Sequence, residues 1–314
     1  MSIFFSGTDS EKSYITKLAF KDSVAETFLG RKSFWQLEKC AIQNSADVQV
    51  SVATRPFAWF APVQSQFFVP TWLDCEADLD RESVTIGKTK SRRRQIRQIQ
   101  RNNFSYSVTT NQEQLLHFYN DMYLPLLAHS HGEAALAMKC DHMLDLAKHH
   151  KAELVLIHQD NEVVAGSFIV YEHGRPRLFS EGVLNADKRY FRAGVGSAIY
   201  LFSYQYLAEK GFSRVNMGRC RAFINDGVFY FKRRFGLEVI GDLGRGMLIK
   251  KISDSASARE FFISNPFVQL KRGRFSAVAF RDHAELSKIS APEEIIEHQV
   301  KGLGNPELLS IQSI

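Results

Sequence analysis

The chain has 314 residues, a length that suits one large domain or two compact ones. Hydrophobic residues make up 45% of it and charged residues 24%, which excludes a collagenous or wholly disordered chain. A formal charge of +6 is small for a dedicated nucleic-acid-binding protein, but it suits a protein whose ligand carries phosphates. The four cysteines are scattered without a C-x-x-C pair, so neither a zinc ribbon nor a disulfide framework is expected.

The first 87 residues predict a small α+β subdomain. Residues 31–43 have the apolar spacing of a helix, and three short stretches punctuated by prolines predict strands. We expect these strands at 48–52, 57–63 and 66–69.

A basic segment follows at residues 88–101, with no acidic residue between it and Glu113. Ile96 and Ile99 lie three residues apart, so a helix here has one narrow buried stripe and a wide cationic face. Two interpretations stay open. The face is either simply solvated, or it binds phosphates or RNA through side chains that include Arg93, Arg94 and Arg97.

Regular elements begin at Asn111, a typical N-cap residue. A helix follows it, and a second helix is expected at 141–151. Three closely spaced strands then predict an antiparallel meander, and a long amphipathic helix closed by Gly211 comes after a polar loop. The expected strands are 153–158, 163–172 and 177–184, and the long helix is 194–210.

The rest of the chain alternates strand and helix before a C-terminal extension. A strand at 214–217 leads into a loop rich in glycine and arginine, then a helix at 225–235 and a last strand at 237–240 or 247–251. We therefore expect a core domain at 88–252 and an extension at 253–314. Its ring-rich first part should pack on the core, and its weakly apolar last 25 or so residues should be mobile or dependent on a partner.

The turn into the long helix has two glycines, in the sequence Phe191-Arg-Ala-Gly-Val-Gly196. Such glycines let the backbone curl around phosphates, and the first amides of a helix are unpaired donors that favour an anion.

This order of elements resembles the GNAT acyltransferase fold, an α+β architecture. GNAT proteins bind the pyrophosphate of a CoA thioester on a turn of pattern Q/R-x-x-G-x-G/A, and here Phe191 stands at its first position, with Arg192 beside it. The resemblance implies that acyl-CoA or another acyl thioester is the donor. It also implies which residues bind the donor's phosphates: Arg192, Gly194, Val195 and Gly196.

A second set of motifs resembles the Fem-like branch of that superfamily, which is related to peptidoglycan aminoacyltransferases. The stretch Met217-Gly-Arg-Cys-Arg221 resembles its G-R-S-like loop, and Phe231-Lys-Arg-Arg-Phe-Gly236 resembles its F-K-x-x-F/W-G signature. The resemblance implies that Lys232 polarises the acyl carbonyl and stabilises the oxyanion. Three residues nearby are candidates for binding substrate: Arg219, Arg221 and Asn225. For the two arginines, an ordinary charged loop is the competing interpretation.

The helical pattern offers a separate argument about Lys232. Val228, Phe231 and Phe235 predict the buried stripe of the helix, and Lys232 lies one position from its edge. A surface lysine is the competing interpretation.

Acyl transfer to an amine also requires a base. Glu181, near the end of the third meander strand, is the first candidate, and Asp187 is the second if the strand's alternation turns Glu181 away. The histidines have no metal spacing, so no metal is expected.

The sequence thus predicts a cytoplasmic N-acyltransferase without a signal peptide or membrane insertion. Its acceptor is a small-molecule or peptide amine, and its donor is a CoA or acyl carrier protein thioester. One alternative is a Fem-type enzyme that uses aminoacyl-tRNA. The other is a catalytically inactive GNAT-like binding module that recruits a phosphate-rich ligand or a protein.

Overall fold

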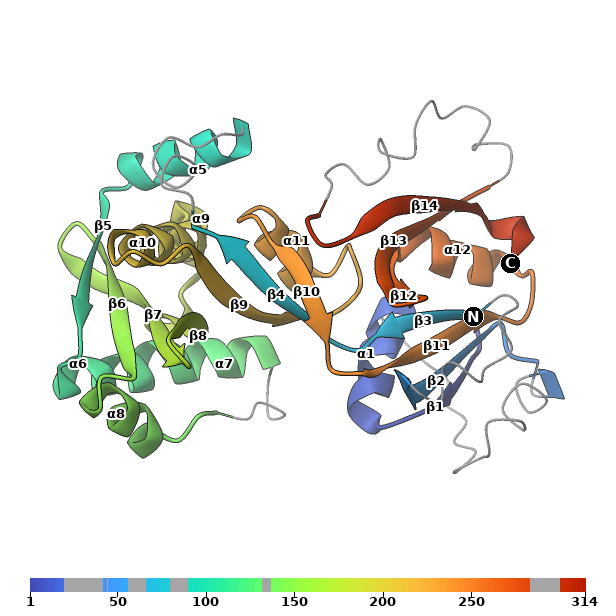
Figure 1. Cartoon of the computed structure of the whole chain (residues 1–314), viewed down its shortest axis with the longest axis horizontal. Helices are drawn as coiled ribbons and strands as arrows, with labels where there is room; N and C mark the ends of the chain where they lie inside the picture. Colours follow the sequence, from blue (N-terminus) through green and yellow to red (C-terminus); the bar gives the residue numbers. More distant parts are fainter. Residues whose placement is uncertain (20–41, 44, 56–65, 80–89, 132–136, 283–299) are drawn as a thin grey trace. The chain divides into compact units, whose positions relative to one another are not determined.

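The structure is a computed structural model that describes residues 1–19, 42–43, 45–55, 66–79, 90–131, 137–282 and 300–314 (Figure 1). The helix predicted at 31–43 lies almost wholly outside the described residues, and the strand predicted at 57–63 lies wholly outside them. The α+β class predicted from the sequence is confirmed.

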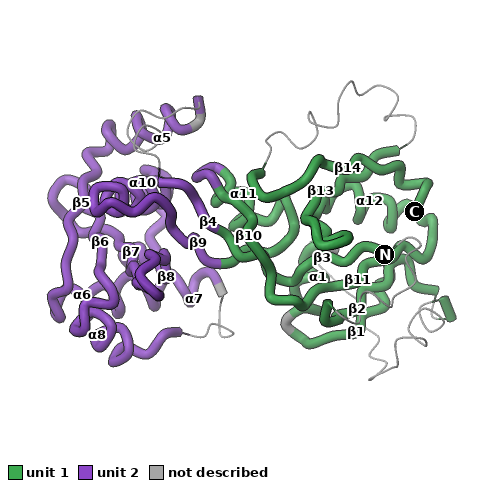
Figure 2. The backbone as a smooth tube through the Cα atoms, in the orientation of Figure 1, with its two compact units in different colours: residues 1–75, 219–233, 237–314 green, residues 76–218, 234–236 purple. Residues whose placement is uncertain are grey.

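The chain divides into two compact units that are not consecutive in sequence (Figure 2). Unit 1 contains residues 1–75, 219–233 and 237–314, and unit 2 contains residues 76–218 and 234–236. This division differs from the three consecutive segments expected above, because the strand at 245–251 pairs with strands from the N-terminal region.

The seven-stranded sheet has the order β10-β4-β9-β8-β7-β6-β5, and β10, the start of β4 and the end of β9 belong to unit 1. The predicted meander is confirmed, and β4 and β5 are additions to the predicted elements. The strands are β4 (Leu73–Asp78), β5 (Phe104–Thr109), β6 (Ala152–Gln159), β7 (Glu162–Glu172), β8 (Arg175–Val183) and β9 (Arg214–Cys220).

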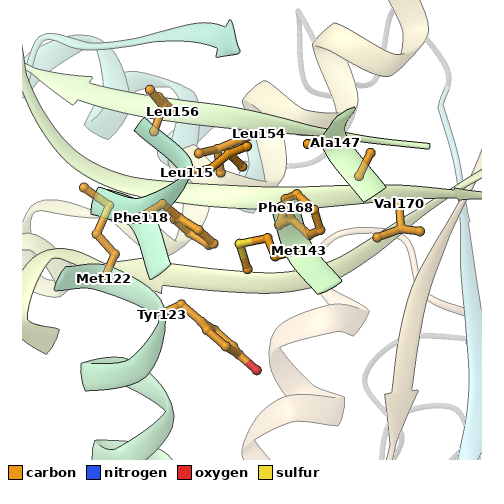
Figure 3. Close-up of a cluster of buried hydrophobic side chains, with 11 residues drawn as sticks. Leu115, Phe118, Met122, Tyr123, Met143, Ala147, Leu154, Leu156, Phe168 and Val170 are labelled. Atoms are coloured by element: carbon orange, nitrogen blue, oxygen red, sulfur yellow. The ribbon is translucent and has the colours of Figure 1, made fainter. Parts of the chain in front are cut away.

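Helices cover both faces of the meander because alternate side chains of each strand point to opposite faces. On one face, Leu154 and Leu156 of β6 pack with Leu115, Phe118 and other apolar side chains of the helices (Figure 3). On the other face, Glu153 accepts a 2.8 Å hydrogen bond from Lys210, which ends the long helix. The helices of unit 2 are α5 (Lys90–Arg101), α6 (Gln112–His117), α7 (Leu124–His131), α8 (Cys140–Lys148), α9 (Lys188–Ala193) and α10 (Val195–Glu209).

A π-helical turn, η1 (Phe118–Tyr123), packs closely against β8 of the sheet. A Cβ atom on Gly182 of β8 would lie 2.8 Å from the backbone of Met122, so only glycine fits there. The close approach fixes the carboxyl end of β8 against the helix layer. A short turn, η3 (Leu184–Ala186), then leads to α9.

Unit 1 contains two further sheets. Parallel β1 and β2 are followed by β11 and β3 in the order β1-β2-β11-β3, and the other sheet has the order β12-β13-β14. The strands are β1 (Ile3–Ser6), β2 (Val48–Thr54), β3 (Gln66–Pro70), β10 (Glu238–Asp242), β11 (Arg245–Lys251), β12 (Phe267–Lys271), β13 (Arg274–Arg281) and β14 (Gly304–Ser310). The helical elements are α1 (Asp9–Ala19), α11 (Gly227–Arg233), α12 (Ala256–Ser264) and η5 (Ile311–Ser313).

Phenylalanine rings form the core of unit 1, as the abundance of this residue suggests. The Phe67 ring lies 5.4 Å from the rings of Phe267 and Phe280, and Phe262 lies 5.1 Å from Phe280. These edge-to-face contacts join β3 to α12, β12 and β13. The ring-rich first part of the C-terminal extension therefore packs into a core, as expected.

The extreme C-terminus differs from the expectation of a mobile tail. Strand β14 pairs in parallel with β13, and the side chain of Ile311 is fully buried. The Nζ atom of Lys251 donates a hydrogen bond to the carbonyl of Ile311. Pairing and burial anchor this end of the chain, although its sequence has little apolar periodicity. Residues 283–299 lie outside the described part of the chain.

None of the helices described combines the length and the apolar character needed to cross a membrane.

Candidate active site

The glycine turn of unit 2 has the backbone conformation that its sequence predicts. Gly194 ends α9 and begins α10 with a φ of 101°, a left-handed value that favours glycine. The amides of Ser197 and Ala198 donate to its carbonyl, at 3.0 and 3.1 Å, and no side chain caps α10. The helix therefore begins with the amides of Val195 and Gly196, the kind of donors that receive an anion.

The basic helix α5 holds this turn from outside. The Gln98 side chain donates a 3.1 Å hydrogen bond to the Arg192 carbonyl, and the Asn102 side chain donates one of the same length to the Ala193 carbonyl. A Cβ atom on Gly194 would lie 2.8 Å from Cδ of Gln98. The cationic helix and the glycine turn are therefore in direct contact. The sequence pattern did not indicate this contact.

The buried face of α5 is more polar than predicted. Ile99 is buried, but Ile96 is only partly buried, and Arg92 and Gln95 complete the buried row. The Arg92 guanidinium lies 4.8 Å from the centre of the Phe235 ring. Burial lowers the pKa of Arg92, and the nearby Tyr204 opposes that shift. The three candidate phosphate-binding side chains, Arg93, Arg94 and Arg97, are exposed.

Strands β8 and β9 run parallel and pair at one position only, Arg177 with Asn216. Glu181 lies beyond that position on β8, opposite Ser167 of β7, and is partly exposed. The fully buried Tyr204 of α10 lies within the electrostatic field of Glu181. Burial raises the pKa of Tyr204, Arg92 opposes the shift, and Glu181 adds to it. The carboxylate candidate therefore lies among ionisable neighbours near the carboxyl end of β8.

Asp187, the second candidate base, caps α9. Its side chain accepts a 2.8 Å hydrogen bond from the Arg189 amide and another from the Arg189 side chain. These hydrogen bonds hold the pKa of Asp187 below its usual value. A carboxylate committed to a helix cap is poorly suited to accept a proton, which favours Glu181.

Lys232 of unit 1 is a buried lysine, with 7% of its surface exposed. Its Nζ atom donates a 2.9 Å hydrogen bond to the carbonyl of Arg219, near the end of β9. The expected stripe is wrong at Val228, which is 49% exposed, because the buried face of α11 consists of Phe229 and Lys232 themselves. The ammonium of Lys232 therefore points inward, which argues against the interpretation of Lys232 as a surface lysine.

The other residues expected to bind substrate have structural partners. The side chain of Arg219 forms a 2.9 Å ion pair with Asp74, and that of Asn225 donates a 3.1 Å hydrogen bond to the carbonyl of Ser264. Asp226, rather than Asn225, accepts hydrogen bonds from the first amides of α11. These partners fix the loop that leads from β9 to Lys232.

Arg221 contacts two aromatic rings of unit 1. Its guanidinium carbon lies 3.9 Å from the centre of the Trp72 ring and 4.5 Å from that of the Tyr14 ring. Neither ring stands near Arg221 in the sequence, so only the folded chain shows the cluster.

Two buried thiols lie beside the same loop. The sulfur atoms of Cys75 and Cys220 are 3.3 Å apart on neighbouring strands. The hydrogen bond between them lowers the pKa of Cys75 and raises that of Cys220, while Lys232 lowers both. Among the residues that the structure describes, no three His, Cys, Asp or Glu side chains are grouped closely enough to hold a metal ion.

No known family profile and no curated protein matches the chain. Among solved structures it is similar to FemX, with 10% identity, coverage of 68% of this chain and 74% of that chain, and a TM-score of 0.43. It is also similar to the C-terminal domain of a putative lysylphosphatidylglycerol synthetase from Agrobacterium fabrum, with 15% identity, coverage of 71% and 73%, and a TM-score of 0.41.

A GCN5-related N-acetyltransferase from Sphaerobacter thermophilus is a third similar structure, with 10% identity, coverage of 66% of this chain and 61% of that chain, and a TM-score of 0.35.

Proposed function

We propose that the chain is an N-acyltransferase that moves an acyl group from a CoA or carrier-protein thioester to an amine. The amine nitrogen attacks the thioester carbonyl, and the tetrahedral intermediate bears an oxyanion. Its collapse breaks the C–S bond, while the proton lost by the amine neutralises the leaving thiolate. The protein has to bind the donor, stabilise the oxyanion and transfer this proton.

The glycine turn is the single observation that carries the proposal. A left-handed Gly194 starts a 15-residue helix without a side-chain cap. The amides of Val195 and Gly196 and the positive end of the helix dipole suit the phosphates of a thioester carrier. Arg192 is exposed beside the turn and supplies a positive charge. We assign the donor's phosphates to these residues.

Lys232 is the proposed oxyanion group. One of its three N–H bonds is directed at the Arg219 carbonyl, which fixes the ammonium and leaves two donors. A buried, prepositioned cation stabilises developing negative charge better than a solvated one, because little reorganisation is needed. The polar contacts of Arg219 and Asn225 position the loop for this role.

Glu181 is the proposed general base. Its partial exposure and its place near the carboxyl end of β8 allow it to accept the proton of the attacking amine, directly or through water.

Aminoacyl-tRNA is the second candidate donor, and the contact between α5 and the turn favours it. The exposed side chains of Arg93, Arg94 and Arg97 belong to α5, the helix whose Gln98 is hydrogen-bonded to the turn. A donor with several phosphates could therefore engage both parts at once.

Donor use is tested by offering acetyl-CoA, a longer acyl-CoA and aminoacyl-tRNA separately, each with a mixed set of amines. Amine-dependent release of free thiol supports the proposal, and amine-dependent deacylation of tRNA supports the second donor. Binding of a donor without any turnover would identify an inactive binding module. If no donor is bound or consumed, the acyltransferase proposal fails.

A further inference from the structure

Arg221 has the features of an anion-binding arginine, and it forms no salt bridge with the residues that the structure describes. The rings of Trp72 and Tyr14 contact its guanidinium, so the plane of the group is held in place. One hydrogen bond of this guanidinium is observed, from Nη1 to the carbonyl of Thr71 at 3.5 Å. A guanidinium has five N–H donors, and most of them are therefore available.

The two carboxylates that act on Arg221 electrostatically, Asp226 and Glu11, have hydrogen-bond or ion-pair partners of their own. Asp226 accepts hydrogen bonds from the Tyr14 hydroxyl at 3.1 Å and from two helix amides. Glu11 forms a 3.0 Å ion pair with Arg245. Within the described ranges no carboxylate forms a salt bridge with Arg221. Arg221 is thus partly buried and has no salt bridge in the described part of the chain, although the charges of Glu11 and Asp226 partly offset the cost of its burial.

Thr71 provides a second, independent indication. The residue is 4% exposed, and its Oγ1 atom has no hydrogen-bond partner in the described part of the chain. A buried hydroxyl without a partner costs free energy, because it has lost its hydrogen bonds to water. The Thr71 carbonyl contacts the Arg221 guanidinium. The unpartnered hydroxyl of Thr71 and the guanidinium therefore belong to the same small region.

We propose that Arg221 and Thr71 bind a carboxylate of the acceptor, and that the acceptor is therefore an amino acid or a peptide with a free carboxylate. This inference rests on the proposed acyltransferase function. A guanidinium held in one plane presents two parallel N–H groups that match the two oxygen atoms of a carboxylate. One cation and one hydroxyl suit a single negative charge, whereas the phosphates of the donor are assigned to the glycine turn.

The test measures binding without turnover, by titration calorimetry on the full chain. The probes are three dipeptides, Gly-Gly, Leu-Leu and Lys-Lys, each compared with its own C-terminal amide. The amides keep the amine and the side chains but lack the carboxylate. We expect at least one dipeptide to bind, and its amide to bind at least tenfold more weakly.

Three variants assign the effect to the site. Arg221→Gln should abolish the preference for the free carboxylate, and Arg221→Lys should restore little of it, because an ammonium lacks the planar pair of donors. Arg274→Gln removes an exposed arginine from the same unit and should leave the preference unchanged. Thermal unfolding of each variant shows whether it is folded.

The inference is overturned if every dipeptide and its amide bind equally, if none binds, or if the preference survives in Arg221→Gln. Inorganic phosphate that competes as well as the carboxylate would also overturn it, by assigning the site to phosphate. Because no donor is present, these outcomes are independent of acyl transfer. Thiol release with amines that lack a carboxylate would leave the proposed function intact while this inference failed.

Discussion

Gly194 is the residue on which the donor site depends most directly. Its φ of 101° is rarely adopted by residues with a side chain, and Gln98 occupies the space that a side chain would need. Both constraints act on the backbone that presents the amides of Val195 and Gly196.

We predict that Gly194→Ala lowers the affinity for the thioester donor at least tenfold. The substitution should also destabilise unit 2 by about 1–2 kcal/mol, since a left-handed residue with a Cβ atom is strained. Donor titration and urea unfolding measure the two effects. Gly174→Ala is the matched control, because Gly174 also has a positive φ but no atom within 4 Å of the added Cβ. That control should lose stability and retain affinity, and equal affinity losses would contradict the assignment.

Lys232 shows what residue patterns can and cannot predict. The motif that contains it was visible in the sequence, and its buried position agrees with the inward-facing interpretation. The predicted buried face of the helix included Val228, which is exposed. The prediction therefore assigned the wrong side of the helix to the core. The partners of Arg221 could not be predicted, because Tyr14 and Trp72 lie 207 and 149 residues before it.

Among the elements, α5 has the most specific consequence for function. Arg94, Gln98 and Asn102 are spaced four residues apart and share one face of the helix, and Gln98 and Asn102 contact the glycine turn. Arg93 and Arg97 belong to the neighbouring row. The side chain of Arg94 is therefore better placed than that of Arg97 to interact with a phosphate at the turn.

We predict that Arg94→Gln raises the Michaelis constant for an acyl-CoA about three- to tenfold, whereas Arg97→Gln changes it less than twofold. If RNA binds, both variants should flatten the salt dependence of RNA binding, by about 0.7–0.9 per lost phosphate contact in log–log form. Steady-state kinetics and filter binding at several salt concentrations measure these effects. Equal Michaelis constants for the two variants would show that the turn and the helix do not share the donor.

Length alone did not decide which elements were predicted, since the short strands β2 and β3 were found and the 11-residue helix α1 was missed. The meander and α10 have many alternating or amphipathic residues, and both were found. Strand β4 does alternate, since Leu73, Cys75 and Ala77 are buried between acidic residues, but six residues give a weak signal. Strand β5 is equally short, and its alternation of Phe104, Tyr106 and Val108 with polar residues was overlooked.

At the scale of the whole molecule, the chain ends help to build unit 1 together with a segment from the middle. Strand β11 pairs with both β2 and β3, although 190 residues separate it from β2 and 174 from β3. A hydrophobic pattern indicates that a strand has a buried face, but it does not name the strand beside it. This is why three consecutive segments were expected and two interleaved units are observed.

The anchored C-terminus gives a prediction at this scale. Ile311 is fully buried, so Ile311→Ala should destabilise unit 1 by about 2–5 kcal/mol through lost burial and a residual cavity. Urea unfolding measures the change. Ser313→Ala is a control from the same terminal turn and should cost less than about 1 kcal/mol. An unchanged midpoint for Ile311→Ala would restore the expectation of a loosely attached tail.

Lys232→Met provides the most direct test of the proposed acyl transfer, because methionine retains much of the side chain's length and removes the ammonium. We predict that kcat for amine acylation falls about 10²- to 10³-fold, the usual effect of losing one oxyanion donor. The Michaelis constant for the donor should stay within a few-fold. Lys271→Met, at an exposed lysine of the same unit, should retain full activity. A folded Lys232→Met protein with an unchanged kcat would contradict the central role assigned to this lysine.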